Sequence, residues 1–156
     1  MNLSQALSKQ LHDVHFGGNW TAVNLKDVLK EVDWQQAIQQ NDQFNTIAKL
    51  VYHIHYYSAA ILKVFEGGPL DASDKFSFDV PPISKGSEWE ALTQKLFQDN
   101  DRLVECISQF DPEKWFEPFA GGKYGTYYRN VAGLIEHTHY HLGQIVIIKK
   151  ILIPEG

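Results

Sequence analysis

Apolar residues recur at every third or fourth position over long stretches of this sequence, which is the spacing of a helix that buries one face. Helix-forming stretches of this kind cover residues 3–16, 42–66, 87–110 and 126–152. No run alternates apolar and polar residues for long enough to demand a strand. We therefore expect an all-α protein in which the four stretches form a four-helix bundle.

Helix-ending and helix-capping residues divide the chain between these stretches. Gly17-Gly18 ends the first and Gly67-Gly68-Pro69 ends the second, because Gly fits a left-handed C-cap and Pro cannot continue a helix. Ser87 with Glu90 three residues later has the pattern of a capping box, which predicts the start of the third long helix.

Shorter elements join the long helices. Asn24 can cap a short helix over residues 25–32, and Asp33 a single turn after it. Residues 68–86 form a long connection, and that length indicates either a functional loop or a crossover between the two ends of a bundle.

Length and composition narrow the class of protein. The chain has 156 residues, so we expect residues 1–156 to form a single domain. A formal net charge of −5 argues against a nucleic-acid-binding protein. The sequence has no secretory signal and no run of about 20 apolar residues, and its single cysteine fits a reducing compartment. We therefore expect a cytoplasmic protein with no membrane partner.

Five of the seven histidines lie in two of the helical stretches. His137 and His141 are four residues apart, so their side chains share one helix face about 6 Å apart and both can reach one metal ion. His139 is rotated from that pair by about 160° and is left out of the site. The second long helix carries His53 and His55, and an imidazole from it would complete a three-histidine site.

A three-histidine site has a definite chemistry. Neutral imidazole favours zinc, nickel, copper or ferrous iron, and three protein ligands leave a position for water or substrate, as in catalytic sites. A protease of the zincin type is disfavoured, because Thr138 follows His137 where that motif requires Glu. The alternative is a metal-free bundle in which the histidines bond backbone carbonyls and serve a structural role.

The sequence around these histidines resembles a known family. The tract from Glu136 to Ile145, EHTHYHLGQI, resembles the last-helix signature of DinB-like proteins, the damage-inducible and thiol S-transferase superfamily. The tract from Thr46 to Ile54, TIAKLVYHI, resembles the second-helix motif of that family. The similarity extends over nearly the whole chain, including the order of the helices and the long connection between the second and third of them.

The resemblance implies an up-down-down-up four-helix bundle, with the long connection as its crossover, and a homodimer. It also implies a divalent metal ion, zinc or nickel, held by His53, His137 and His141. Characterised relatives include transferases that use bacillithiol, mycothiol or glutathione, and a metal-bound thiol is deprotonated to a nucleophilic thiolate. His55 is the strongest rival to His53, and Gln144 is a candidate to orient one of the ligands.

Two hypotheses for the function follow from the residues and the resemblance together. The first is a metal-dependent enzyme that transfers a low-molecular-weight thiol onto a small electrophilic molecule, or hydrolyses such a molecule. The second is a non-catalytic dimer that binds a metal or a small ligand. We assign no general base. The tyrosines near the two motifs can shape a pocket, but we interpret most of them as packing or dimer contacts: Tyr52, Tyr56, Tyr57, Tyr124, Tyr127, Tyr128 and Tyr140.

Overall fold

The computed structural model describes residues 1–152, which contain six α-helices and no β-strand, so the expected all-α class is confirmed over that range. Residues 153–156, the end of the predicted domain, lie outside the described residues. The helices are α1 (Leu3–Phe16), α2 (Leu25–Lys30), α3 (Trp34–Ile38), α4 (Ile47–Phe65), α5 (Gly86–Gln109) and α6 (Tyr127–Leu152). Three short 3₁₀ turns lie in the connections, at Asp74–Phe76, Pro112–Lys114 and Phe119–Gly121.

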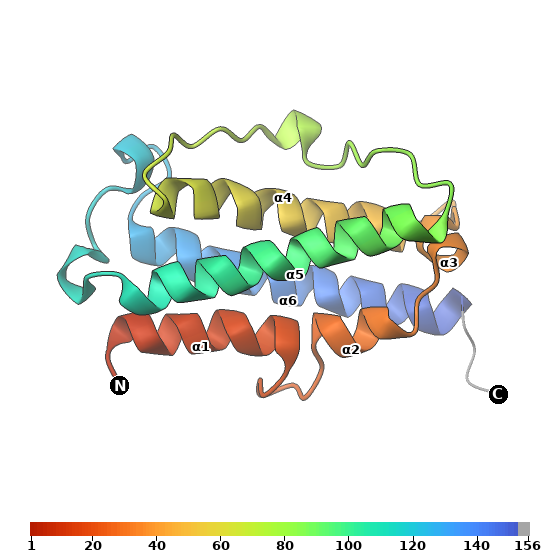
Figure 1. Cartoon of the computed structure of the whole chain (residues 1–156), viewed down its shortest axis with the longest axis horizontal. Coiled ribbons are helices and arrows are strands. Elements are labelled where there is room, and N and C mark those ends of the chain that lie inside the picture. The colour runs from red at the N-terminus through yellow and green to blue at the C-terminus, as the bar shows by residue number, and fades with distance from the viewer. Residues whose placement is uncertain (153–156) are drawn as a thin grey trace.

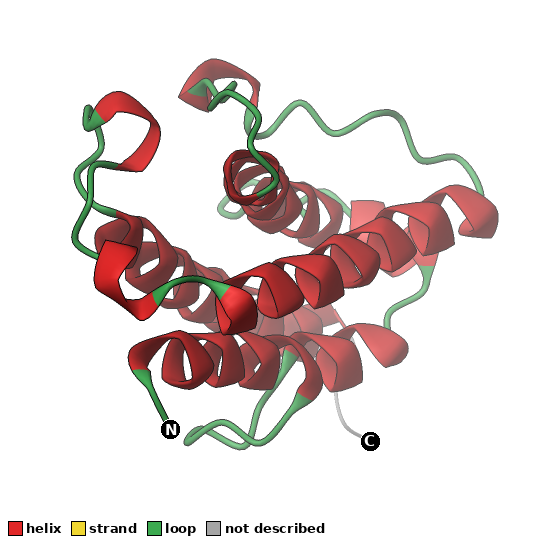
Figure 2. Cartoon of the chain, turned by 60° about the vertical axis from the view of Figure 1, so that its left-hand side comes forward, coloured by secondary structure: helices red, strands yellow, loops and turns green. Residues whose placement is uncertain are grey.

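The four long helices lie side by side (Figure 1). α5 packs against α1 and α4, and α6 packs against the same two helices. α4 and α5 run in one direction, while α1 and α6 run in the opposite direction (Figure 1). Because α4 and α5 are parallel neighbours, the chain between them must return along the length of the molecule. Figure 2 shows that this connection, residues 66–85, runs over the outside of the long helices.

The core lies between the long helices and draws on all four of them. Leu11 of α1, Ile54 of α4, Leu103 of α5 and Ile145 of α6 are each 0 % exposed. These side chains belong to the periodic apolar positions of the sequence, so the predicted helix faces are the buried ones.

The helix ends show which residues act as caps. Gly17 ends α1 with φ +113°, a conformation that favours glycine, and Asn24 and Asp33 cap α2 and α3 as expected. α4 begins at Ile47 rather than at residue 42, because the side chain of Thr46 accepts a hydrogen bond from the backbone of Lys49.

The expected capping box at the start of α5 is wrong. Glu88 accepts hydrogen bonds from the backbone N–H of Ser84, at 2.7 Å, and from its hydroxyl, at 3.1 Å. The helix begins at Gly86, directly after the N-cap residue Lys85. Ser87 therefore lies inside the first turn and does not cap it. None of the described helices is both long enough and apolar enough to cross a membrane.

Candidate metal centre

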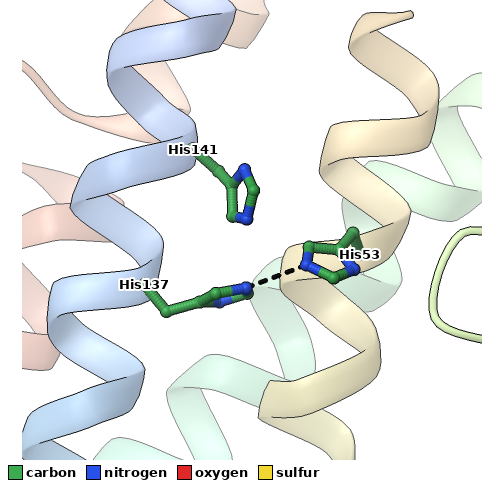
Figure 3. A group of neighbouring side chains, drawn as sticks. All are labelled: His53, His137 and His141. Atoms are coloured by element: carbon green, nitrogen blue, oxygen red, sulfur yellow. Dashed lines mark hydrogen bonds between the residues drawn. The ribbon is translucent and has the colours of Figure 1, made fainter. Parts of the chain in front are cut away.

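Three histidines from two helices point toward one another (Figure 3). His53 comes from α4, and His137 and His141 come from successive turns of α6. One ring nitrogen from each of the three lies within 4.8 Å of the others. The Nε2 atoms of His53 and His137 are 2.9 Å apart. The helix periodicity places the α6 pair, and the packing of α4 against α6 places His53 opposite it.

The connection between α4 and α5 orients His53. Its Nδ1 donates a hydrogen bond to the backbone carbonyl of Ser77 at 3.2 Å. Its ring also stacks on Phe78, with ring centroids 3.9 Å apart and planes 9° from parallel. A carbonyl only accepts, so Nδ1 carries the proton and Nε2 presents a lone pair toward the two histidines of α6.

His141 is oriented from within its own helix. Its Nδ1 lies 2.6 Å from Oε1 of Gln144, three residues further along α6. Donation to this oxygen leaves the Nε2 lone pair of His141 free for a ligand. Gln144 therefore lies where the sequence placed a residue that orients one of these histidines.

His137 has a polar atom without a partner. Its Nε2 faces His53, and its Nδ1 is buried with no hydrogen-bond partner among residues 1–152. Tyr57 packs edge-on against the ring, with centroids 5.2 Å apart. The ring of His137 is therefore positioned by its packing against Tyr57 and its contact with His53, and not by a hydrogen bond at Nδ1.

Burial keeps all three imidazoles neutral near pH 7. Burial has the largest effect on the pKa of each ring. It lowers the pKa of His53 and of His141 below the ordinary value of 6.5. It lowers the pKa of His137 to about 4, and the neighbouring His141 and His53 lower it further. Neutral imidazoles cannot form ion pairs but can ligate a metal ion.

The spacing of the nitrogen atoms fits one small divalent ion. Two nitrogens bound to zinc at about 2.0–2.1 Å in a tetrahedron lie about 3.4 Å apart. The 2.9 Å between the nitrogens of His53 and His137 and the 4.8 Å limit for the whole group bracket this value. The three histidines can therefore hold a metal ion with small adjustments of their side chains.

The histidines line a cavity of about 880 Å³, within the range of roughly 300–1,000 Å³ typical of small-molecule sites. Four of the seven tyrosines line it, more than the sequence led us to expect: Tyr57, Tyr124, Tyr128 and Tyr140. Tyr52 and Tyr56 border a separate, smaller pocket, and Tyr127 packs on Phe110 and Phe119. The tyrosines thus serve as pocket wall and as packing in different places.

The remaining histidines lie outside this group. His55, the rival to His53, bonds Asp99 of α5 at 2.8 Å through Nε2. His15 is fully buried in α1, and its Nδ1 bonds the carbonyl of Leu11. His12 and His139 are likewise not part of the three-histidine group.

Residues of the long connection complete the surroundings of the site, and no motif in the sequence predicts them. Ser77 and Phe78 orient His53, and Asp74 lines the cavity and accepts a hydrogen bond from the hydroxyl of Tyr57. The length of the connection is the only sequence signal for these residues. It indicates that the connection has a function, but it does not identify which of its residues contribute.

Comparison with known proteins identifies the family. A family model described as the DinB superfamily, which includes metal-binding proteins, matches residues 8–145. No curated protein and no solved structure matches the chain. The matched range spans most of the chain and contains both histidine motifs and all three clustered histidines. The chain belongs to the DinB superfamily.

Proposed function

We propose that this protein is a metal-dependent enzyme that transfers a low-molecular-weight thiol onto a small electrophilic molecule, or hydrolyses such a molecule. One observation carries the proposal: three neutral imidazole nitrogens converge at the wall of a cavity large enough for a small molecule. His53, His137 and His141 would hold the ion, zinc or nickel, through one nitrogen each. Three protein ligands leave a coordination position for the substrate, as in catalytic sites.

When bound, the ion supplies Lewis-acid chemistry, which lowers the pKa of a thiol or a water molecule. The residues of the chain supply orientation. Ser77 and Gln144 hold His53 and His141 in the tautomers whose Nε2 atoms carry lone pairs. Phe78 covers one face of His53 and keeps water from it.

Tyr57 and Asp74 provide the polar groups beside the histidines. Burial, reinforced by the hydrogen bond to Asp74, raises the pKa of Tyr57 to about 12, so its hydroxyl remains a hydrogen-bond donor near pH 7. This bond holds the Asp74 carboxylate at the cavity wall, where it can accept a proton from the incoming thiol or water.

The transfer reaction can be written for a chlorinated arene as the electrophile. The thiol sulfur forms a bond to the ring carbon, the carbon–chlorine bond breaks, and chloride leaves with the electron pair. The thiol proton passes to a base and then to solvent, so no oxidant or reductant is needed.

Metal content tests the site. Protein purified without a histidine tag should contain about one zinc or nickel ion per chain by elemental analysis. His53→Ala and His137→Ala should lose that ion, whereas His139→Ala, a control on the same helix as His137, should retain it. Full metal content in the first two variants would show that the ion binds elsewhere.

Turnover separates the enzyme from the alternative, a non-catalytic metal- or ligand-binding protein. We expect the metal-loaded protein to consume a thiol in the presence of 1-chloro-2,4-dinitrobenzene, assayed in turn with bacillithiol, mycothiol and glutathione. Metal-free protein should not raise the rate above that of the uncatalysed reaction between the thiol and this electrophile. Bound metal without turnover of any thiol, or of ester and amide substrates, would favour the binding protein.

We also propose that the fold is an up-down-down-up four-helix bundle with residues 66–85 as its crossover, which the helix directions in Figure 1 support. The single domain over residues 1–156, the homodimer, the cytoplasmic location, and the small-molecule partner without nucleic acid or membrane stay predictions. Light scattering of the purified protein tests the dimer directly.

A further inference from the structure

The cavity extends beyond the three histidines along one face of α6. Arg129, Gly133 and His137 follow one another at intervals of four residues and all three line the cavity. Eight residues of α-helix span about 12 Å, so Arg129 lies about that far from His137 along the helix axis. A molecule that reaches both ends must be elongated.

Gly133 keeps the middle of this face open. A Cβ atom at this position would meet no atom within 4 Å, so close packing does not explain the glycine. Its backbone is helical, and alanine is more stable than glycine in a helix interior. The space that the missing side chain leaves belongs to the cavity, between the charged end and the histidines.

Arg129 is held in place by the loop that precedes α6. Its Nη1 donates to the backbone carbonyl of Tyr124 at 2.9 Å. A Cβ atom on Gly125, which has φ +84°, would lie 2.9 Å from Cδ of the exposed Arg129 side chain, so the loop and the arginine are in close contact. Among the described residues, no carboxylate forms an ion pair with Arg129, so its remaining N–H groups are available to a ligand.

We propose that Arg129 forms a subsite for the carboxylate of an elongated small molecule that lies over Gly133 with its other end at the three histidines. The planar guanidinium matches a carboxylate with two parallel hydrogen bonds. Asp74 and Glu136 also line the cavity, so a single negative charge is better tolerated there than the double charge of a phosphate. Only the reacting end of this molecule rests on the proposed function.

Binding to the metal-free protein tests the subsite by itself. The probes are 4-(4-fluorophenyl)butanoate and its neutral counterpart 4-(4-fluorophenyl)butan-1-ol, titrated by fluorine NMR in the presence of EDTA. We expect the carboxylate to bind about tenfold more tightly than the alcohol, the effect of one charge-assisted hydrogen-bonded pair. Arg129→Gln should remove this preference and leave the affinity for the alcohol unchanged.

Two control variants separate the subsite from general effects of charge and bulk. Lys123→Gln removes a neighbouring positive charge that does not line the cavity, so it should keep the preference. Gly133→Leu should weaken both probes about tenfold or more, whereas Gly143→Leu, at an exposed position of the same helix outside the cavity, should weaken neither.

Equal affinities for the two probes, a carboxylate preference that survives Arg129→Gln, or no binding of either probe at millimolar concentration would overturn the subsite. Since no metal is present, none of these results bears on the metal site. Conversely, loss of the proposed metal chemistry would leave a carboxylate preference that depends on Arg129 intact. The two proposals can therefore fail separately.

Discussion

Acidification should destabilise this protein through His15, a buried histidine of α1 that does not belong to the three-histidine group. The side chain is 0 % exposed, and its Nδ1 donates to the carbonyl of Leu11 at 2.8 Å. Its Nε2 is buried with no hydrogen-bond partner among residues 1–152. Burial, the largest influence, lowers the pKa of His15 from 6.5 to about 4, because no partner stabilises a second proton.

The direction and size of the effect follow from this difference. Below pH 6.5 the unfolded chain binds a proton at His15 that the folded chain does not, so the unfolded state gains stability as the pH falls. The contribution of the neutral histidine is complete above pH 6.5 and is lost between pH 6.5 and about pH 4. The full loss is about 3 kcal/mol, and about 2 kcal/mol of it is reached at about pH 5.

Urea unfolding followed by tryptophan fluorescence measures this loss. We compare the metal-free wild type with His15→Gln at about pH 7.5 and about pH 5, and we expect the variant to lose about 2 kcal/mol less on acidification. Val14→Ala is the matched control: it truncates a buried neighbour on α1 but removes no titratable group. It should be less stable than the wild type at both pH values, with the same difference between them.

The same pH dependence in His15→Gln as in the wild type would refute the reasoning. An NMR titration of the wild type gives an independent check that does not depend on the folding of the variant. The His15 ring should stay neutral until the pH approaches about 4. Protonation of the folded protein near pH 6.5 would be equally decisive against the prediction.

Three further changes test the site and the packing around it. Gln144→Met removes the acceptor of His141 Nδ1, so metal affinity should fall about 10–100-fold in a chelator competition titration; unchanged affinity would contradict this role. Asp99→Asn replaces the buried carboxylate that bonds both His55 and Lys95, so urea unfolding should show a loss of about 2 kcal/mol, and no loss would mean that these two bonds together are not stabilising. Trp115→Phe removes the 2.8 Å hydrogen bond to the Ser4 hydroxyl, so the free energy of unfolding should fall by about 1 kcal/mol or more, whereas equal stability would exclude a net contribution.

Helices were easier to predict than their ends. The periodic apolar positions predict the buried face of each long helix correctly, because many residues together form the core. A cap depends on one side chain, and the sequence offers competing caps within a few residues. At the start of α5 no side chain caps the first turn, and Glu88 instead accepts from the backbone N–H and the hydroxyl of Ser84. The sequence alone does not distinguish the two pairs, since each has a hydroxyl and a carboxylate within about one helical turn.

The histidine group was predictable to the extent that it is local. His137 and His141 share a helix face by spacing alone, and Gln144, three residues beyond His141, is within reach by the same rule. The prediction of His53 rather than His55 rests on the family resemblance. On one helix the two point in different directions, and the structure turns His55 toward Asp99 of α5. The arrangement of α4 between α5 and α6 decides this, and the spacing of the histidines does not reveal it.

Groups from different parts of the chain orient the histidines of the candidate metal centre. Two of the three histidines belong to α6, so helix geometry sets their separation, whereas His53 depends on a carbonyl of the α4–α5 connection for its tautomer. Tyr56 anchors that connection to α4 by accepting from the backbone N–H of Ser73 at 2.8 Å, and Tyr57 bonds Asp74 a residue later. These bonds hold the connection in place beside the three histidines, and its position determines the orientation of His53. The length that marked it in the sequence reflects both the return path between parallel helices and this contact with His53.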